Sequence, residues 1–384
     1  MIVDLVGFGI VMPVLPFYAE SYGADGTTLG LIMTAYAAMQ FVFAPVWGRL
    51  SDRLGRRPVL LVTIAGTAIG LLALGFAGSI AAIVAARLLG GAFAANLGVA
   101  SAYITDVTPP EERTRWMGLL GASFGVGFVL GPAIGGVLAP YGYHVPLLAA
   151  AGLAALNWIQ ALVFLREPPA REAVAAEPAR GAASGRLGEL RDPLVRRLCL
   201  VNLLFSLGVT QLETMFAFFM LRRFGWDARE VAFLLVAMAV LMGGIQGGGM
   251  KALSARFADR SLVLLGSALL TLGFALLPGA TSLPLLGVAL VLAAVGRAGA
   301  QPALMSLTSR AAPAARRGAV MGVFQSAASL ARVIGPLAGG WLFDRATTGP
   351  FLLASALLAA AVAVAWALPA RLADADAVGE PDVA

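Results

Sequence analysis

Charged side chains inside long apolar stretches are the residues of this sequence best suited to chemistry. Five of them interrupt such stretches: Asp4, Arg87, Glu213, Arg297 and Arg332. A charge at the centre of a bilayer costs about 3 kcal/mol on insertion scales. We therefore expect each one to face a water-filled cavity or a partner. A functional site and a set of structural ion pairs would both meet that requirement.

Glu213 has the most informative neighbourhood of the five. Gln211 and Thr214 stand close to it, and three aromatic residues follow at positions 216, 218 and 219. A carboxylate among aromatic rings suits a cationic, lipophilic compound, because the rings bind the apolar part and the acid binds the charge. The same phenylalanines would serve equally well as bulk that faces lipid.

The composition places these charges in a membrane. Of the 384 residues, 59% are hydrophobic and 12% are charged, whereas a soluble chain averages about 25% charged residues. One cysteine excludes an internal disulfide, and one histidine argues against a metal centre. Because no segment resembles a nucleotide-binding loop, an ion gradient or the substrate's own gradient must supply the energy. We expect no cofactor, no metal and no nucleic-acid partner, and too few candidate groups for an enzyme.

Twelve apolar runs are long enough to cross a bilayer, and they must do so as helices because no backbone group can stay unpaired in lipid. They cover roughly residues 1–19, 28–49, 58–77, 80–104, 115–138, 143–165, 196–221, 228–252, 260–278, 282–306, 317–342 and 348–369. A polar stretch divides them six and six. We expect an N-terminal bundle over 1–165, a cytoplasmic linker over 166–195, a second bundle over 196–370 and a cytoplasmic tail over 371–384.

Arginine and lysine predict the orientation, because loops rich in them stay on the cytoplasmic side. With both termini inside, most of the 27 basic residues fall in the inner loops. The outer loops then carry only Arg222, Arg223, Arg229 and Arg345. The sequence therefore predicts a multi-pass protein with both termini cytoplasmic.

An internal repeat indicates two related halves. The segment Gly131-Pro132-Ala133-Ile134-Gly135-Gly136 returns 204 residues later as Gly335-Pro336-Leu337-Ala338-Gly339-Gly340. Small residues at this spacing let helices pack backbone to backbone, and the proline bends the helix. The repetition shows that helix packing is part of the role of this segment.

A basic segment from Gly48 to Pro58 separates the second and third runs. Its key residues are Gly48, Asp52, Arg53, Gly55, Arg56 and Arg57, and they predict a tight turn on the cytoplasmic side. The matching turn of the second half has Ala255 where the first has Asp52. The acid is therefore not required to form the turn.

The pattern G-x-L-x-D-R-x-G-R-R-P in this segment closely resembles the loop signature of the major facilitator superfamily. A generic basic hairpin would explain the arginines but not Asp52, Gly48 and Gly55 at these spacings. The resemblance implies an all-α membrane protein with twelve transmembrane helices in two pseudo-symmetric six-helix bundles. It also implies that the loop braces an inner gate.

In that gate the resemblance places Asp52 at the cytoplasmic start of the eleventh helix, near Gly318. Asp106, at the inner end of the fourth helix, would then pair with Arg53 or Arg56. The alternative is that Asp52 only offsets the positive charge around it.

Two further segments resemble signatures of drug–proton exchangers. The antiporter signature is matched by Gly127, Gly131, Pro132, Gly135 and Gly136. A motif thought to assist proton movement begins at Arg87, but this chain departs from it at Gly90 and Phe93, which leaves the role of the arginine open. Over the whole chain, the resemblance is to the tetracycline-type and multidrug antiporters.

This resemblance implies that helices one, four, seven and ten line a central cavity, with Asp4, Arg87, Glu213 and Arg297 falling one on each. We expect proton-coupled export of a small amphipathic, drug-like compound by alternating access. The partners would be the small-molecule substrate, protons and membrane lipid, with the protein acting as a monomer in the bacterial inner membrane.

Within this scheme we assign proton coupling to Asp4, in the inner half of its helix, and recognition of substrate charge to Glu213. If Arg87 or Arg332 kept Asp4 ionised, Glu213 would be the proton site instead. The alternatives in function are a uniporter or symporter of a metabolite such as a sugar or amino acid, a transport-dead receptor, and a membrane enzyme.

Overall fold

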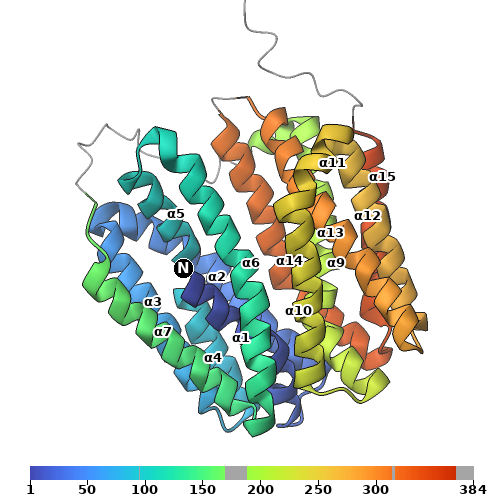
Figure 1. Ribbon diagram of the computed structural model, residues 1–384, viewed down its shortest axis with the longest axis horizontal. Coiled ribbons are helices and arrows are strands. Elements are labelled where there is room, and N and C mark those ends of the chain that lie inside the picture. The colour runs from blue at the N-terminus through green and yellow to red at the C-terminus, as the bar shows by residue number, and fades with distance from the viewer. Residues whose placement is uncertain (95, 169–187, 314–315, 369–384) are drawn as a thin grey trace, which may run out of the picture. The chain divides into compact units, whose positions relative to one another are not determined.

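The computed structural model describes residues 1–94, 96–168, 188–313 and 316–368, and every regular element in these ranges is a helix (Figure 1). Twelve helical segments of the described chain are long and apolar enough to span a membrane. They coincide with the twelve runs expected from the sequence. The all-α, twelve-helix prediction is therefore confirmed.

The helices of the first half are α1 (Ile2–Glu20), α2 (Gly26–Leu54), α3 (Arg56–Gly75), α4 (Ile80–Phe93), α5 (Asn96–Val107), α6 (Arg113–Leu138) and α7 (His144–Phe164). Those of the second half are α9 (Pro193–Phe224), α10 (Ala228–Gly244), α11 (Met250–Arg256), α12 (Asp259–Leu276), α13 (Leu283–Ala311), α14 (Arg317–Arg345) and α15 (Gly349–Trp366). The fourth and eighth spans each comprise two of these helices.

The fourth span is interrupted, although the apolar pattern predicts a single run over 80–104. α4 ends at Phe93, and Ala94 leaves the helical conformation with ψ near 41°. Carbonyl groups released at such a break need new donors in a membrane. α2 supplies them: Gln40 Nε2 donates to the carbonyl of Ala94 at 2.8 Å, and Trp47 Nε1 donates to that of Ala92 at 2.6 Å.

The eighth span is continuous but irregular. A π-helical segment, Ile245–Gly249, joins α10 to α11. Three of its five residues are glycines. Glycine lowers the stability of a regular α-helix, so a π-helical turn can replace the α-helical turn where glycines cluster.

The chain forms two compact units. The first comprises Met1–Val174, Glu213–Val240 and Gly335–Thr347, and the second comprises Ala175–Leu212, Leu241–Ile334 and Thr348–Ala384. Each of the helices α9, α10 and α14 contributes residues to both.

In the first unit α1 packs on α6 and α7, α3 packs on α4 and α7, and α2 packs on α4 (Figure 1). Val59, Leu60 and Ile64 of α3 form a buried apolar cluster with two residues of α5. The Tyr18 hydroxyl, buried at the end of α1, donates to the carbonyl of Ala77 at 2.5 Å. This hydrogen bond joins α1 to the loop after α3.

In the second unit α12 packs on α13 and α15. Gly266 and Gly296 lie face to face, because a Cβ at Gly266 would come within 2.6 Å of the carbonyl oxygen of Gly296. Asn202, on α9, is buried and donates from Nδ2 to the carbonyl of Phe324 at 2.7 Å. These contacts use small or paired polar groups, as helices in a membrane require.

Candidate functional site

Asp4, the expected proton site, lies on α1 against α7. Its Oδ1 accepts a hydrogen bond from Nδ2 of Asn157 at 2.9 Å. Asn157 is itself buried, and Oδ2 of Asp4 is buried without a hydrogen-bond partner in the described part of the chain. The acid therefore has a neutral amide as its hydrogen-bond partner, not one of the arginines. Nothing in the spacing of Asp4 and Asn157, 153 positions apart, signals this pair.

Arg87 is buried in α4, where only 7% of the residue is exposed. The centre of its guanidinium group lies 3.9 Å from the centroid of the Tyr36 ring, on α2. Such cation–π contacts stabilise a charge that has left water. Gly90 lies beside this ring, since a Cβ there would make an ordinary van der Waals contact with Tyr36 Cε2 at 3.7 Å. The departure from the family motif at Gly90 therefore coincides with the tyrosine that covers the arginine.

Tyr36 also begins a row of aromatic rings across α2, α1 and α6. The ring of Phe8 lies 6.3 Å from those of Tyr36 and Phe128, and the ring of Phe128 lies 6.5 Å from that of Phe124. These separations fall in the range in which aromatic pairs attract each other. Phe8 is 38% exposed, so the row offers accessible ring surface close to a buried positive charge.

Glu213 and Gln211 stand near the middle of α9. Gln211 is buried, and its Nε2 donates to the carbonyl of Leu207 one turn earlier at 3.1 Å. Glu213 is half-buried. The phenylalanines at 216, 218 and 219 are all buried, which argues against the interpretation that they face lipid.

The five charged residues of the apolar stretches, which we expect to face the cavity together with Gln211, fall in both units. Asp4, Arg87 and Glu213 belong to the first unit, and Gln211, Arg297 and Arg332 belong to the second. Arg297 is half-buried on α13, whereas Arg332 is exposed on α14.

The basic segment is mostly helical, and its turn is a single residue. α2 continues to Leu54 and α3 begins at Arg56, so only Gly55 separates them, with φ at +99°. Glycine adopts such a φ without the strain that a side chain would add. The sequence predicted that Gly48 and Asp52 belong to the turn, but both lie on α2. The helix continues past them because only Gly55 has to adopt a positive φ.

Arg56 bonds to two acids. Its Nε lies 2.8 Å from Oδ2 of Asp106, on α5, and its Nη1 lies 2.6 Å from Oδ1 of Asp52. The side chains of Arg56 and Asp106 are 18% and 15% exposed, whereas that of Asp52 is 61% exposed. Arg53 and Arg56 were the two partners expected for Asp106, and the structure shows the ion pair with Arg56.

Glu167 completes this corner, although the sequence predicts that it belongs to the linker. Its carboxylate accepts the backbone N–H groups of Arg56 at 2.7 Å and Arg57 at 3.0 Å, which caps α3. Arg57 Nε donates in return to the carbonyl of Leu165 at 2.7 Å, at the end of α7. An acid that follows a long apolar run by two residues is too weak a signal to predict such a cap.

The glycines of the antiporter signature line the contact between α6 and α1. A Cβ at Gly131 would lie 2.5 Å from the Cα of Gly9, and one at Gly127 would lie 2.6 Å from Cβ of Leu5. Gly135 faces Ile10, which also lies on α1, whereas Gly136 faces Ala232 of α10. Pro132 lies among them, and a Cβ on Gly9 would be 3.2 Å from its ring. The signature thus lets two helices touch through their backbones.

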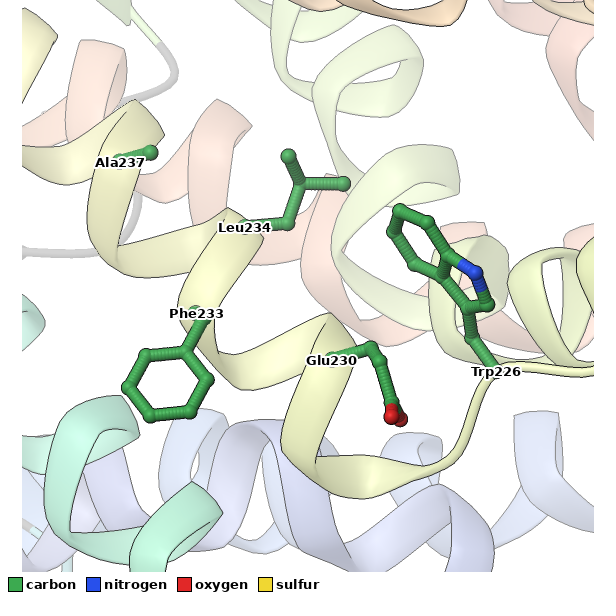
Figure 2. A pocket seen from close by; sticks show the side chains of 5 residues that line it. All are labelled: Trp226, Glu230, Phe233, Leu234 and Ala237. Atoms are coloured by element: carbon green, nitrogen blue, oxygen red, sulfur yellow. The ribbon is translucent and has the colours of Figure 1, made fainter. Parts of the chain in front are cut away.

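One open hollow lies apart from these residues, at the start of α10 (Figure 2). It has a volume of about 400 Å³ and is lined by Trp226, Glu230, Phe233, Leu234 and Ala237. Glu230 accepts the backbone N–H of Asp227 at 3.0 Å. Its carboxylate therefore already serves the start of the helix.

Comparisons with known proteins agree with this architecture. The Major Facilitator Superfamily profile matches residues 1–260 and 249–381. The class D tetracycline resistance protein of Salmonella ordonez is 32% identical over 352 residues, which is 90% of this chain and 88% of that protein. Multidrug resistance protein 1 of Bacillus subtilis (strain 168) is 28% identical over 379 residues, which is 97% and 95% of the two chains.

Solved structures share the fold. The human organic anion transporter MFSD10 (TETRAN) superposes with a TM-score of 0.70 at 26% identity, covering 95% of this chain and 96% of that one. A bacterial homologue of the lysosomal transporter Spinster, in an inward-facing and occupied conformation, superposes with a TM-score of 0.77 at 16% identity. That alignment covers 95% of this chain and 93% of the other.

Proposed function

Since this chain belongs to the major facilitator superfamily, whose members are transporters and not enzymes, we propose that it exports a small amphipathic, drug-like compound in exchange for protons. The protein is a multi-pass membrane transporter of a small molecule. Export and proton coupling are the parts that we infer, and relatives named tetracycline and multidrug resistance proteins support export.

Asp4 carries the proposal of proton coupling. Antiport needs a group whose protonation and whose support of substrate binding exclude each other. A buried carboxylate oxygen without a hydrogen-bond partner among the described residues can accept a proton at little structural cost. Asn157 presents one N–H to the other oxygen and leaves this one unoccupied. Asp4 can therefore take up and release a proton, which is the first half of this requirement.

The aromatic row supports an amphipathic substrate with flat apolar parts. Rings of Phe8, Phe128 and Tyr36 offer stacking and edge contacts, and Arg87 adds a positive charge behind Tyr36. Glu213, near buried phenylalanines on α9, would recognise positive groups. A compound with an apolar aromatic body and polar or charged substituents matches this combination.

The pairing of Arg56 supports the inner gate. Two acids share the guanidinium group, and the more exposed one, Asp52, remains close to the end of α2. We propose that Asp52 also braces this gate, because an exposed carboxylate is favoured by the positive end of a helix dipole. The gate would close the cytoplasmic side of a monomer in the bacterial inner membrane, with both termini cytoplasmic.

A growth screen against a panel of toxic compounds, with and without expression, identifies the substrate. Everted membrane vesicles then test the coupling, because an antiporter moves protons when the substrate is added. Asp4→Asn should abolish substrate uptake driven by a proton gradient yet retain substrate binding or downhill exchange. Glu111→Gln, at an exposed acid before α6, is the matched control.

Each outcome decides a different part of the proposal. If the unaltered protein moves no protons with any exported compound, proton antiport is wrong. If Asp4→Asn still accumulates substrate against its gradient with the normal pH dependence, Asp4 is not the coupling group and Glu213 takes its place.

A further inference from the structure

The start of α2 receives a hydrogen-bond acceptor from a distant part of the chain. The first turn of a helix presents backbone N–H groups that have no partner within the helix. In α2, Asp25 accepts the N–H of Thr28 at 2.8 Å, as an ordinary cap. Asp344, in the last turn of α14, accepts the N–H of Gly26 at 2.7 Å and that of Thr27 at 2.8 Å. Its Oδ2 also accepts the hydroxyl of Thr27 at 2.5 Å.

Glycines bring the two helices close enough for these bonds. Gly26 and Gly30 lie one turn apart on α2, and Pro336, Gly340 and Asp344 lie one turn apart on α14. A Cβ at Gly340 would overlap the backbone of Gly26, and a Cβ at Gly30 would overlap that of Pro336. Two ridges of backbone therefore meet, and the carboxylate of Asp344 closes the contact at its end.

The sequence repeat has a counterpart of this contact without the acid. Gly340 corresponds to Gly136, which also lies against a second helix, since a Cβ at Gly136 would come within 2.6 Å of Cβ of Ala232 on α10. The residue that corresponds to Asp344 is Pro140, which offers no carboxylate. The acid is therefore not needed for packing by the repeated glycines. Because only the second copy of the repeat has it, Asp344 calls for a separate role.

The contact is specific in geometry, and two of its three hydrogen bonds, those from Thr27, are exposed, whereas the one from Gly26 is part-buried. Asp344 is exposed, and water can replace each hydrogen bond made at an exposed helix end at small cost. Hydrogen bonds from Thr28 keep the pKa of the neighbouring Asp25 below its usual value, so that acid is already engaged. An interaction with defined partners and low strength can form and break repeatedly.

We propose that Asp344 and the first turn of α2 form a latch, which consists of Gly26, Thr27 and Gly30 on α2 with Pro336, Gly340 and Asp344 on α14. The latch keeps the outer ends of these two helices together, and it opens once in each transport cycle. The proposal rests on the proposed function in one respect, since alternating access requires the outer ends to separate. Its first test needs no substrate.

The first test measures how fast an outside reagent reaches a buried residue in the first turn of α2. Leu29 is fully buried in the first turn of α2, and Leu29→Cys in a Cys199→Ser background provides the reporter. Asp344→Ala should raise the rate of labelling by a membrane-impermeant maleimide about two- to fivefold, the range for charges at exposed helix ends. Arg345→Gln is the control, because Arg345 stacks on Trp341 of its own helix, 3.5 Å from the ring centroid.

Unchanged labelling of Asp344→Ala, or an equal rise in Arg345→Gln, would overturn the latch. If Leu29→Cys fails to reach the membrane, the double variant Thr27→Cys with Asp344→Cys replaces it. Its two cysteines can form a disulfide between the start of α2 and the end of α14. The oxidised pair should transport no substrate and regain transport in dithiothreitol, whereas the transport by each single cysteine variant should respond to neither the oxidant nor dithiothreitol. Normal transport by a fully cross-linked pair would show that the contact does not open. Failure of all variants to move any compound would count against the proposed function instead.

Discussion

Arg56 and Asp106 form an ion pair of 2.8 Å between α3 and α5, with both side chains mostly removed from water. Asp52 binds the same guanidinium group from an exposed position. Arg56 therefore joins three helices at one corner of the first unit. The difference in exposure between its two acids leads to different expectations for them.

Asp106→Asn should lower the stability of the protein more than Asp52→Asn. Loss of a charge-assisted hydrogen bond from a largely buried pair costs about 1–3 kcal/mol. Loss of an exposed ion pair costs less than about 1 kcal/mol. Apparent melting temperatures of the purified variants in one detergent measure the order. Equal melting temperatures would show that the buried and the exposed ion pair contribute equally to stability.

Asp52→Asn should instead act on transport. The amide keeps the shape of the side chain, and the second half of the chain makes its own turn without an acid, so expression should be normal. Transport should fall sharply if Asp52 braces the inner gate. Uptake normalised to the amount of protein in the membrane is the measurement. Near-normal uptake would leave Asp52 as a local counter-charge.

Gly131→Ala should destabilise the contact between α1 and α6. The added carbon would lie 2.5 Å from Cα of Gly9, and backbone atoms cannot give way as a flexible side chain can. Overpacking of this kind costs about 1–3 kcal/mol. Gly125→Ala on the same helix is the matched control, since no atom lies within 4 Å of its new carbon. If both variants accumulate and melt alike, the close backbone contact is unimportant.

Glu213→Gln should weaken the transport of cationic compounds more than that of neutral ones. The amide retains hydrogen bonding but not charge, so the apparent KM for cations should rise about tenfold, as expected for one charge-assisted interaction. Glu230→Gln, which removes the acid of the hollow in Figure 2, is the control. A larger effect at Glu230 would move cation recognition from α9 to the hollow.

Cysteine labelling tests the predicted orientation in a Cys199→Ser background. Gly78→Cys and Gly279→Cys should react with an impermeant thiol reagent from outside, because both positions have open space around them and lie in expected outer loops. Ala183→Cys, which lies outside the described residues, should react only from inside. Reversed accessibility would contradict the orientation derived from the arginine-rich loops.

The sequence by itself was enough to predict the twelve helices and the family fold. Apolar runs of spanning length are a local property of the chain, and lipid forces them to become helices because no water is present to pair their backbone. The repeated glycines likewise predicted backbone contact between helices, and Gly131 and Gly135 make it with α1.

Only the tertiary structure decided which residues meet. Asn157 is the partner of Asp4, Tyr36 covers Arg87, and Glu167 caps α3. These pairs depend on which faces of two helices come together, and the hydrophobicity of nearly uniform apolar helices does not mark a face. The cap of α2 by Asp344 joins residues more than 300 positions apart for the same reason. The N–H groups at the start of a helix donate to any carboxylate that the fold brings near them.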